Sequence, residues 1–270
     1  MKYIRKLTFS LILISTLLLV CSFAYHPYFG SNYRKENVIE QQKENNAQAA
    51  SMKGREILQK AVEAAGGLEK FAEIKSFRIK TQNVIYLTQN EMQLTVTETV
   101  MLPNQTKQVM EMPQGKRIQV LNGDNGWKQI GQNIYALTEA EKREMKRGLF
   151  RDTIRIYRMS GSEDLQIKYF GEESVGGEQL YVLQIKNKFG DFFNLYVDAE
   201  SFLAVKKTYH GTSEVGLAML EEIYSDYREV DGIKLPFHIE VRANGRKFID
   251  SVVVDAKFNL EISEEFFLKK

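Results

Sequence analysis

The chain has few side chains of the kinds that catalyse reactions or bind metals. Its histidines are His26, His210 and His238, and its single cysteine is Cys21. His210 and His238 lie on separate predicted strands without a second histidine or cysteine nearby, so the ligand spacing of a zinc or iron site is missing. The sequence predicts no metal site and no cofactor, and one cysteine excludes an intrachain disulfide.

The motifs of common enzyme classes are also missing from the sequence. There is no Gly-x-Ser-x-Gly elbow, no glycine loop ending in Lys-Ser or Lys-Thr, and no dinucleotide fingerprint. The carboxy-terminal strands carry Asp226, Asp231, Asp250 and Asp255. A glycosidase needs two carboxylates facing one cleft, and this spacing does not select a pair. We therefore expect no catalytic residues, and an unrecognised hydrolase is the alternative.

One charge pattern could bind a partner. Arg143, Arg147, Arg151 and Arg155 recur every four residues in a predicted helix, which places them on one side of it. We interpret Arg143, Arg147 and Arg151 as a surface for anionic lipid headgroups or an acidic partner. A solvated helix face, balanced by neighbouring glutamates, is the alternative.

Apolar side chains alternate with polar ones in several predicted strands. In residues 233–243, isoleucine, leucine, phenylalanine and valine occupy every second position, between the turns Asp231-Gly232 and Asn244-Gly245. Such turns favour hairpins, and the alternation is typical of a sheet with one dry face. The same pattern in other strands gives nine candidates for the lining of an apolar ligand site: Leu94, Val96, Val100, Phe193, Leu195, Leu235, Phe237, Ile239 and Val241.

The predicted elements amount to an α+β protein. Roughly a dozen short antiparallel strands extend from Ser76 to Phe258, a number at which a sheet must curl or split. Helical periodicity covers 54–74, split at Gly66-Gly67, and about 139–159, starting at the capping box Thr138-x-x-Glu141 and bent or broken near Gly148. Since the strands are neighbours in sequence, a meander is the simplest topology.

The amino terminus predicts export. Lys2, Arg5 and Lys6 precede an uncharged run and then Ser22-Phe23-Ala24, the features of a signal peptide over residues 1–24. An uncleaved membrane anchor at 7–24 and acylation at Cys21 are the alternatives. Residues 25–52 are polar and predict a flexible linker before a domain at 53–270.

Cleavage after residue 24 removes three of the 37 basic residues and no acid, which leaves 34 bases against 35 acids. The resulting net charge is −1, whereas nucleic-acid-binding proteins usually carry an excess of basic residues. We expect no nucleic-acid partner, and we expect a monomer.

Several segments resemble the outer-membrane lipoprotein-sorting family, which is related to the LolA and LolB lipoprotein carriers. The most specific segment is YSDYREVDGIKLPF, from Tyr224 to Phe237. The others are Ile57-Leu58 through Ala65-Gly66-Gly67, Asn122-Gly123-Asp124-x-Gly126-Trp127, Tyr196-Val197-Asp198 with Leu203-Ala204-Val205, and Phe258-Asn259 with Phe266-Phe267.

The resemblance implies an incomplete, open antiparallel barrel of roughly 11 strands whose concave face is covered by helices. It also implies a non-enzymatic protein of the periplasm or cell envelope that holds an acyl chain of a lipid or lipoprotein in a hydrophobic concavity. A sensor or adaptor that regulates a membrane or protease partner through the same fold is the alternative.

Overall fold

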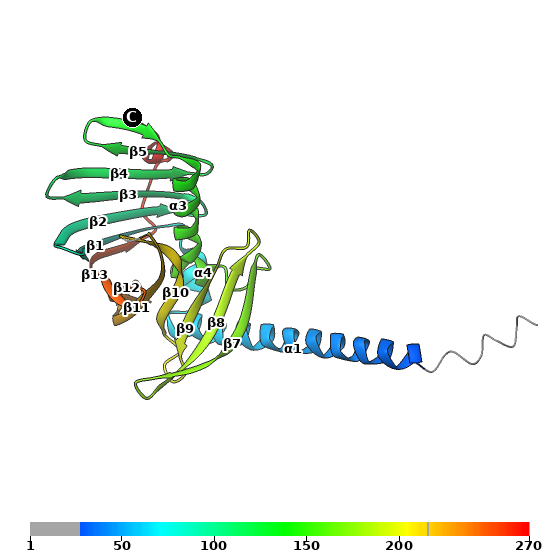
Figure 1. Ribbon diagram of the computed structural model, residues 1–270. Helices are drawn as coiled ribbons and strands as arrows, with labels where there is room; N and C mark the ends of the chain where they lie inside the picture. The colour runs from blue at the N-terminus through cyan, green and yellow to red at the C-terminus, as the bar shows by residue number, and fades with distance from the viewer. Residues whose placement is uncertain (1–27, 215, 270) are drawn as a thin grey trace, which may run out of the picture. The chain divides into compact units, whose positions relative to one another are not determined.

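The computed structural model describes residues 28–214 and 216–269. The predicted signal peptide, with Cys21 and His26, lies outside these residues. Helices and strands follow along the chain as labelled in Figure 1: α1 (Tyr28–Ala64), α2 (Leu68–Glu73), β1 (Ser76–Tyr86), β2 (Glu91–Met101), β3 (Gln105–Met112), β4 (Gly115–Asn122), β5 (Asn125–Ile130), β6 (Asn133–Ala136), α3 (Glu139–Arg151), α4 (Thr153–Arg158), β7 (Leu165–Val175), β8 (Glu178–Asn187), β9 (Phe192–Asp198), β10 (Ala204–Ser213), β11 (Gly216–Val230), β12 (Ile233–Ala243), β13 (Arg246–Phe258) and the 3-10 turn η1 (Glu264–Phe267).

Helix α1 differs from the linker expected at 25–52. Residues from Tyr28 onward are helical, and the side chains of 39–49 are exposed. The segment has little to bury, but between Ser31 and Lys53 it contains no glycine or proline and is rich in Glu, Gln, Lys and Ala. These are strong helix formers, so polarity alone was a poor guide to its backbone.

The chain divides into two compact units, 1–49 and 50–270. None of the described helices has the length and apolar content needed to cross a membrane.

The sheet confirms the predicted open antiparallel architecture. Its strands pair in the order β6-β5-β4-β3-β2-β1-β13-β12-β11-β10-β9-β8-β7. Two meanders are therefore joined by the pairing of β1 with β13, and β6 and β7 remain as edges. The sheet has 13 strands, more than the roughly 11 expected, because every short edge segment pairs into the same sheet.

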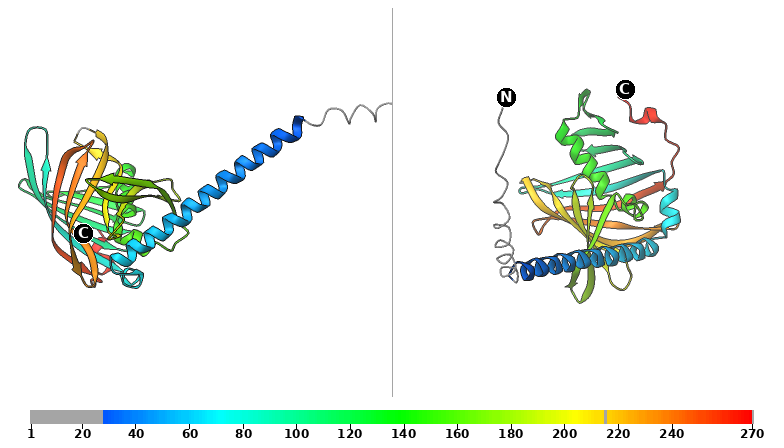
Figure 2. Two further views of the ribbon diagram at one scale, coloured as in Figure 1. Left: turned by 90° about the horizontal axis from the view of Figure 1, so that it is seen from below. Right: turned by 90° about the vertical axis from the view of Figure 1, so that its right-hand side faces the viewer.

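The sheet curls through its turns and bulges. Asp231-Gly232 and Asn244-Gly245 have positive φ at both positions, as in the predicted hairpin turns. The pairing register shifts at Lys80/Thr81, at Val241/Arg242 and at two further places. Each bulge increases the local twist of its strand. In Figures 1 and 2 the strands bend around the side of the sheet that carries α3 and α4.

The helices fill the middle of the concave face. Ile57, Leu58 and Ala61 of α1, Phe71 of α2, and apolar residues of α3 and α4 share one buried cluster with the inward side chains of the sheet. Burying an aliphatic side chain of this kind stabilises the fold by about 1.5–3 kcal/mol. The prediction that helices cover the concave face is therefore confirmed.

The second helical region breaks at Asp152 and not near Gly148, where we expected the break. Gly148 is inside α3, and no atom lies within 4 Å of the Cβ that it lacks. Asp152 has an extended backbone, and its carboxylate accepts a hydrogen bond from the Arg155 N–H, so it caps α4. A capping side chain that competes with the helix outweighed the modest cost of one glycine. The capping box of Thr138 and Glu141 is present as predicted.

Glycine at position 54 allows α1 to approach the sheet closely. A Cβ at Gly54 would lie 2.7 Å from the backbone nitrogen of Tyr169 in β7. The neighbouring Arg55 donates a 2.9 Å hydrogen bond to the Leu165 carbonyl in the same strand. Glycine inside a helix costs roughly 1 kcal/mol relative to alanine, and the packing of α1 on β7 offsets that cost.

The carboxyl of Asp152 gives a test of this arrangement. Burial raises the pKa of the Asp152 carboxyl to about 6, and the negative charge of Glu98 adds to this rise. The hydrogen bond from the Arg155 N–H lowers the pKa but does not outweigh burial. Because the folded pKa lies above the unfolded one, ionisation of Asp152 disfavours folding at neutral pH, and this effect disappears as pH falls from about 6 toward 4. Asp152→Asn keeps an amide oxygen as the cap, and we expect it to raise the free energy of unfolding by on the order of 1–2 kcal/mol at pH 8.

Urea unfolding of both proteins at pH 8 and pH 4 measures this difference, which should shrink to near zero at pH 4. Asp152→Ala, which loses the cap, should be less stable than Asp152→Asn by about 1 kcal/mol at both values. An equal gain for Asp152→Asn at the two pH values would contradict the assignment.

Candidate functional site

A cavity of about 650 Å³ lies beside α3 and α4. One side is formed by the β2–β3 and β4–β5 turns, which contribute Asn104 and Gly123, and the other by the β8–β9 loop at 187–191. Its floor consists of the apolar side chains of Leu121, Leu149, Phe150, Met159 and Leu165, and two exposed apolar residues, Pro103 and Phe189, also line it. The volume and the apolar lining fit the common range for small-ligand sites, about 300–1,000 Å³.

The helix pair positions this floor. Leu149 and Phe150 are buried in the last turn of α3, where the Phe150 ring contacts the Phe193 ring edge-on at 5.4 Å. Met159 follows α4 and packs partly against the same core. The two helices meet at Asp152, and residues on both sides of this break line the cavity.

Three ion pairs occupy the rim of the cavity. Lys146 Nζ lies 2.6 Å from Asp124, Arg147 Nε lies 2.8 Å from Asp191, and Lys188 Nζ lies 3.5 Å from Asp164. The hydrogen bond from Lys146 lowers the pKa of Asp124, and the hydrogen bond to Asp191 raises that of Arg147. The first two bridges tie α3 to the two sides of the cavity, and the third joins the β8–β9 loop to the segment before β7. Their basic side chains are about half exposed, so water screens each bridge and its contribution to stability is small.

The predicted arginine face divides in the structure. Arg143 and Arg147 line the cavity, and so does Arg155. Arg151 points elsewhere, pairing with Glu144 at 2.6 Å and stacking over the Tyr209 ring at 4.1 Å. Two of the three predicted surface residues are thus brought together and the third is not. Arg147 and Arg151 have acidic partners within the chain, as expected for the alternative of a balanced, solvated face.

None of the nine predicted lining residues lines this cavity. Val100, Phe193, Leu195 and Leu235 belong to the packed core, and Phe237 and Ile239 pack partly against it. Leu94 is buried, and Val96 and Val241 are half-buried; these three are not in the core cluster. Contact of the nine side chains with a ligand stays a prediction. The alternation of apolar and polar residues missed Phe189, which lines the cavity from a turn. An aromatic residue exposed in a turn is the signal that could have identified it.

A polar cluster on the concave face was also missed. Glu222 lies 2.9 Å from Lys207 Nζ and accepts hydrogen bonds of 2.7 Å from Tyr209 and Tyr224. Burial raises the pKa of Glu222, but Lys207 and the two hydroxyls outweigh this effect and lower it overall. Lys207 also donates to the Arg151 carbonyl at 2.9 Å. Each of the four side chains has a hydrogen-bond or ion-pair partner, and the cluster lies beside a smaller cavity of about 170 Å³.

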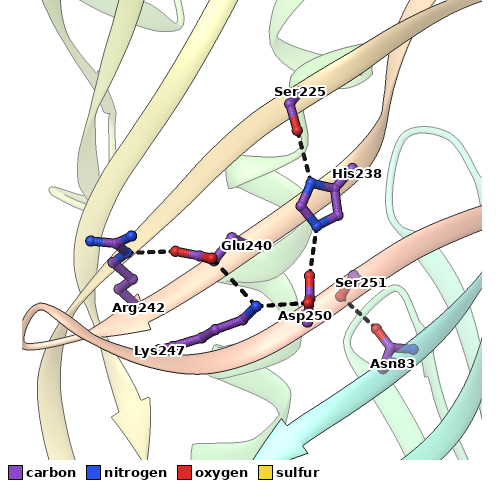
Figure 3. Close-up of polar contacts among 8 residues, drawn as sticks. All are labelled: Asn83, Ser225, His238, Glu240, Arg242, Lys247, Asp250 and Ser251. Atoms are coloured by element: carbon purple, nitrogen blue, oxygen red, sulfur yellow. Dashed lines mark hydrogen bonds and ion pairs between the residues drawn. The ribbon is translucent and has the colours of Figure 1, made fainter. Parts of the chain in front are cut away.

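The convex face carries the arrangement closest to a catalytic one (Figure 3). Ser225 Oγ lies 2.8 Å from His238 Nδ1, and His238 Nε2 lies 2.6 Å from Asp250 Oδ1. The three residues come from β11, β12 and β13, and Lys247 also bonds Asp250 at 2.7 Å. The hydrogen bond from Lys247, more than that from His238, lowers the pKa of Asp250.

This network does not border a cavity in which a substrate could bind. Catalysis by a serine and histidine also needs donors aimed at an oxyanion. Ser225 and His238 are paired with each other in the β ladder, and neither lines any of the three cavities described for the chain. In the part of the chain that the structure describes, no group of three or more His, Cys, Asp or Glu side chains could hold a metal ion. The network therefore fits cross-strand stabilisation of three strands.

We expect Ser225→Ala to leave ester hydrolysis unchanged, because Ser225 faces His238 in the β ladder and lines none of the three cavities where a substrate could bind. Release of p-nitrophenol from p-nitrophenyl acetate by wild type should match that by Ser225→Ala and His238→Ala after subtraction of the buffer rate. A wild-type rate at least tenfold above both variants would show that the network is catalytic.

No protein-family model and no curated protein sequence matches the chain. Solved structures do match it. A LolA superfamily protein from Nitrosomonas europaea is 16% identical, with a TM-score of 0.55 over 80% of this chain and 97% of that one. A DUF1329 family protein from Desulfovibrio piger is 12% identical, with a TM-score of 0.55 over 81% and 97%.

A domain from Vibrio parahaemolyticus named for outer-membrane lipoprotein sorting is 11% identical, with a TM-score of 0.52 over 80% of this chain and 97% of that one. Identities this low show a shared fold and nothing finer. The matches cover about four fifths of this chain, and they confirm the resemblance found in the sequence at the level of architecture. The chain has a LolA-like fold.

Proposed function

We propose that this protein is an exported, non-enzymatic carrier that binds the acyl chain of a lipid or lipoprotein in the cavity beside α3 and α4. The observation that carries the proposal is the cavity itself, with about 650 Å³ of space over an apolar floor. Side chains of the helices pack into the core on other parts of the concave face, and the cavity beside the Lys207–Glu222 cluster is much smaller, at about 170 Å³. The name of the Vibrio parahaemolyticus domain, which has the same fold, supports a role in lipoprotein sorting.

The energetics of the floor fit reversible binding. Each methylene buried gains about 0.8 kcal/mol, and association costs several kcal/mol in lost freedom. A chain of ten or so buried carbons therefore leaves a modest surplus. An acyl chain can then be taken up and released without a change of fold.

The rim offers a way in. Arg147 and Asp191 bridge α3 to the β8–β9 loop, and Lys146 and Asp124 bridge α3 to the β4–β5 turn. Water reaches both bridges, so opening them costs little free energy. The floor residues Leu149 and Phe150 stay fixed in the core meanwhile. In this proposal the mouth widens while the sheet and the helix break remain in place.

The sensor or adaptor alternative depends on the arginine face as a partner surface. In the structure Arg147 and Arg151 pair with Asp191 and Glu144 of the same chain. Such pairing weakens the attraction of this face for an acidic partner protein. The charge pattern therefore favours the carrier.

Export rests on the predicted signal peptide at residues 1–24, and an intact mass beginning at residue 25 would support cleavage.

Filling the cavity should abolish lipid binding. We expect the protein purified from membranes to show a lipid adduct by native mass spectrometry and to take up a fluorescent fatty acid. Met159→Trp places a large ring among the floor residues and should lower uptake at least tenfold. Met219→Trp makes the same change at a side chain that is 38% exposed on β11 and should leave uptake unchanged.

Thermal unfolding of both variants controls for loss of structure. A wild-type mass without any adduct, together with no uptake of the fatty acid, would reject the carrier. Equal loss of uptake in the two tryptophan variants would place the binding site elsewhere.

A further inference from the structure

The charges around the cavity do not balance. Its lining contains five basic residues and three acidic ones. Each acid is already within ion-pair distance of one base, in the three rim bridges formed by Lys146, Arg147 and Lys188. Arg143 and Arg155 remain without an ion pair among the described residues. The cavity is therefore a site with an apolar floor and two uncompensated cations.

Arg155 differs from Arg143 in its surroundings. Arg143 is exposed on α3, while Arg155 is half-buried in the first turn of α4. Its backbone N–H is capped by Asp152, which fixes its position on the helix. It lines the cavity together with Phe150, Met159 and Leu165. A guanidinium thus sits next to apolar floor residues, and no carboxylate of the described chain lies within 4 Å of it.

Such a placement is costly for the protein alone. Burial lowers the pKa of Arg155, and the more distant charge of Asp152 only partly offsets this effect. A guanidinium removed from water gains most from a planar anion, which it binds through two parallel hydrogen bonds. Half-buried pairs of this kind are also stronger than those on an exposed surface, because water screens them less.

We propose that the ligand is a single-chain amphiphile with an acidic end, a carboxylate or a phosphate, which pairs with Arg155 while the hydrocarbon lies on the apolar floor. This inference rests on the proposed carrier function and names the chemical class of its ligand. Arg143, on the exposed face of α3, attracts the anion to the mouth, and Arg155 holds it. A neutral lipid of equal chain length leaves Arg155 unpaired and binds more weakly.

The test compares three ligands that share a twelve-carbon chain: laurate, dodecyl phosphate and dodecanol. Each is titrated calorimetrically, below its critical micelle concentration, into the wild-type protein. We expect both anions to bind at least tenfold more tightly than dodecanol. The ratio of the two anion affinities distinguishes a free fatty acid from a phosphate-bearing lipid as the source of the acid.

Arg155→Gln should remove the preference. We expect it to weaken laurate and dodecyl phosphate about tenfold, which is roughly 1.4 kcal/mol, and to leave dodecanol unchanged. Arg158→Gln makes the same change at an exposed residue of α4 that does not line the cavity and should alter none of the three affinities. Arg155→Lys keeps the charge without the paired donors and should fall between wild type and Arg155→Gln.

The outcomes separate this inference from the carrier proposal. Equal wild-type affinity for laurate and dodecanol, or equal effects of Arg155→Gln and Arg158→Gln, would overturn the role of Arg155 and leave the carrier intact. Failure of all three ligands to bind would overturn both. Unfolding midpoints of the variants show whether a loss reflects unfolding, and the unchanged dodecanol affinity provides a second check in the same protein.

Discussion

The positions of α3 and α4 depend on one buried interaction, that of Lys207 with Glu222 and the Arg151 carbonyl. Lys207 lies between the carboxylate and the last carbonyl of α3, and Tyr209 and Tyr224 complete the bonding of the carboxylate. A buried charge pair is stabilising only when its remaining hydrogen bonds are satisfied, as they are here. The interaction fixes the end of α3 on β10 and β11. Since Asp152 follows immediately, the direction of α4 and the placement of Arg155 are set from the same point.

This constraint explains why the concave face is neither empty nor fully closed. A curled sheet of 13 strands exposes more apolar surface than its own side chains can cover, and the helices supply the rest of the core. Two short helices that meet at a fixed bend cannot follow the curvature of the whole sheet. The space left beside them is the cavity, bounded by the turns and loops to which the rim ion pairs connect.

Much of the fold could be predicted because its signals are local. Dipeptides such as Asp231-Gly232 fix a turn and hence the register of two strands, and the sequential pairing of the meanders follows from short connections. The site could not be predicted in this way. Val100, Phe193 and Leu195 obey the same alternation whether a ligand or a helix covers them, and only the long-range placement of the helices decides which. Lys207 and Glu222 occupy inward positions where the alternation predicts apolar residues. The alternation therefore could not predict the ion pair that positions α3.

The two kinds of ion pair in this molecule have different consequences for a bound chain. The Lys207 side chain is 6% exposed. Breaking its pair with Glu222 would therefore leave an unpaired charge in the core, which costs several kcal/mol. The rim pairs of Lys146 and Arg147 are about half exposed and exchange readily with water. Motion of α3 is therefore easiest at its middle turn, where Lys146 and Arg147 border the mouth, and most restricted at Arg151. A ligand would enter past the weak bridges and meet Arg155 on the side that does not move. If a chain binds as proposed, the fixed guanidinium and floor set its affinity, and the exposed pairs set its rate of exchange.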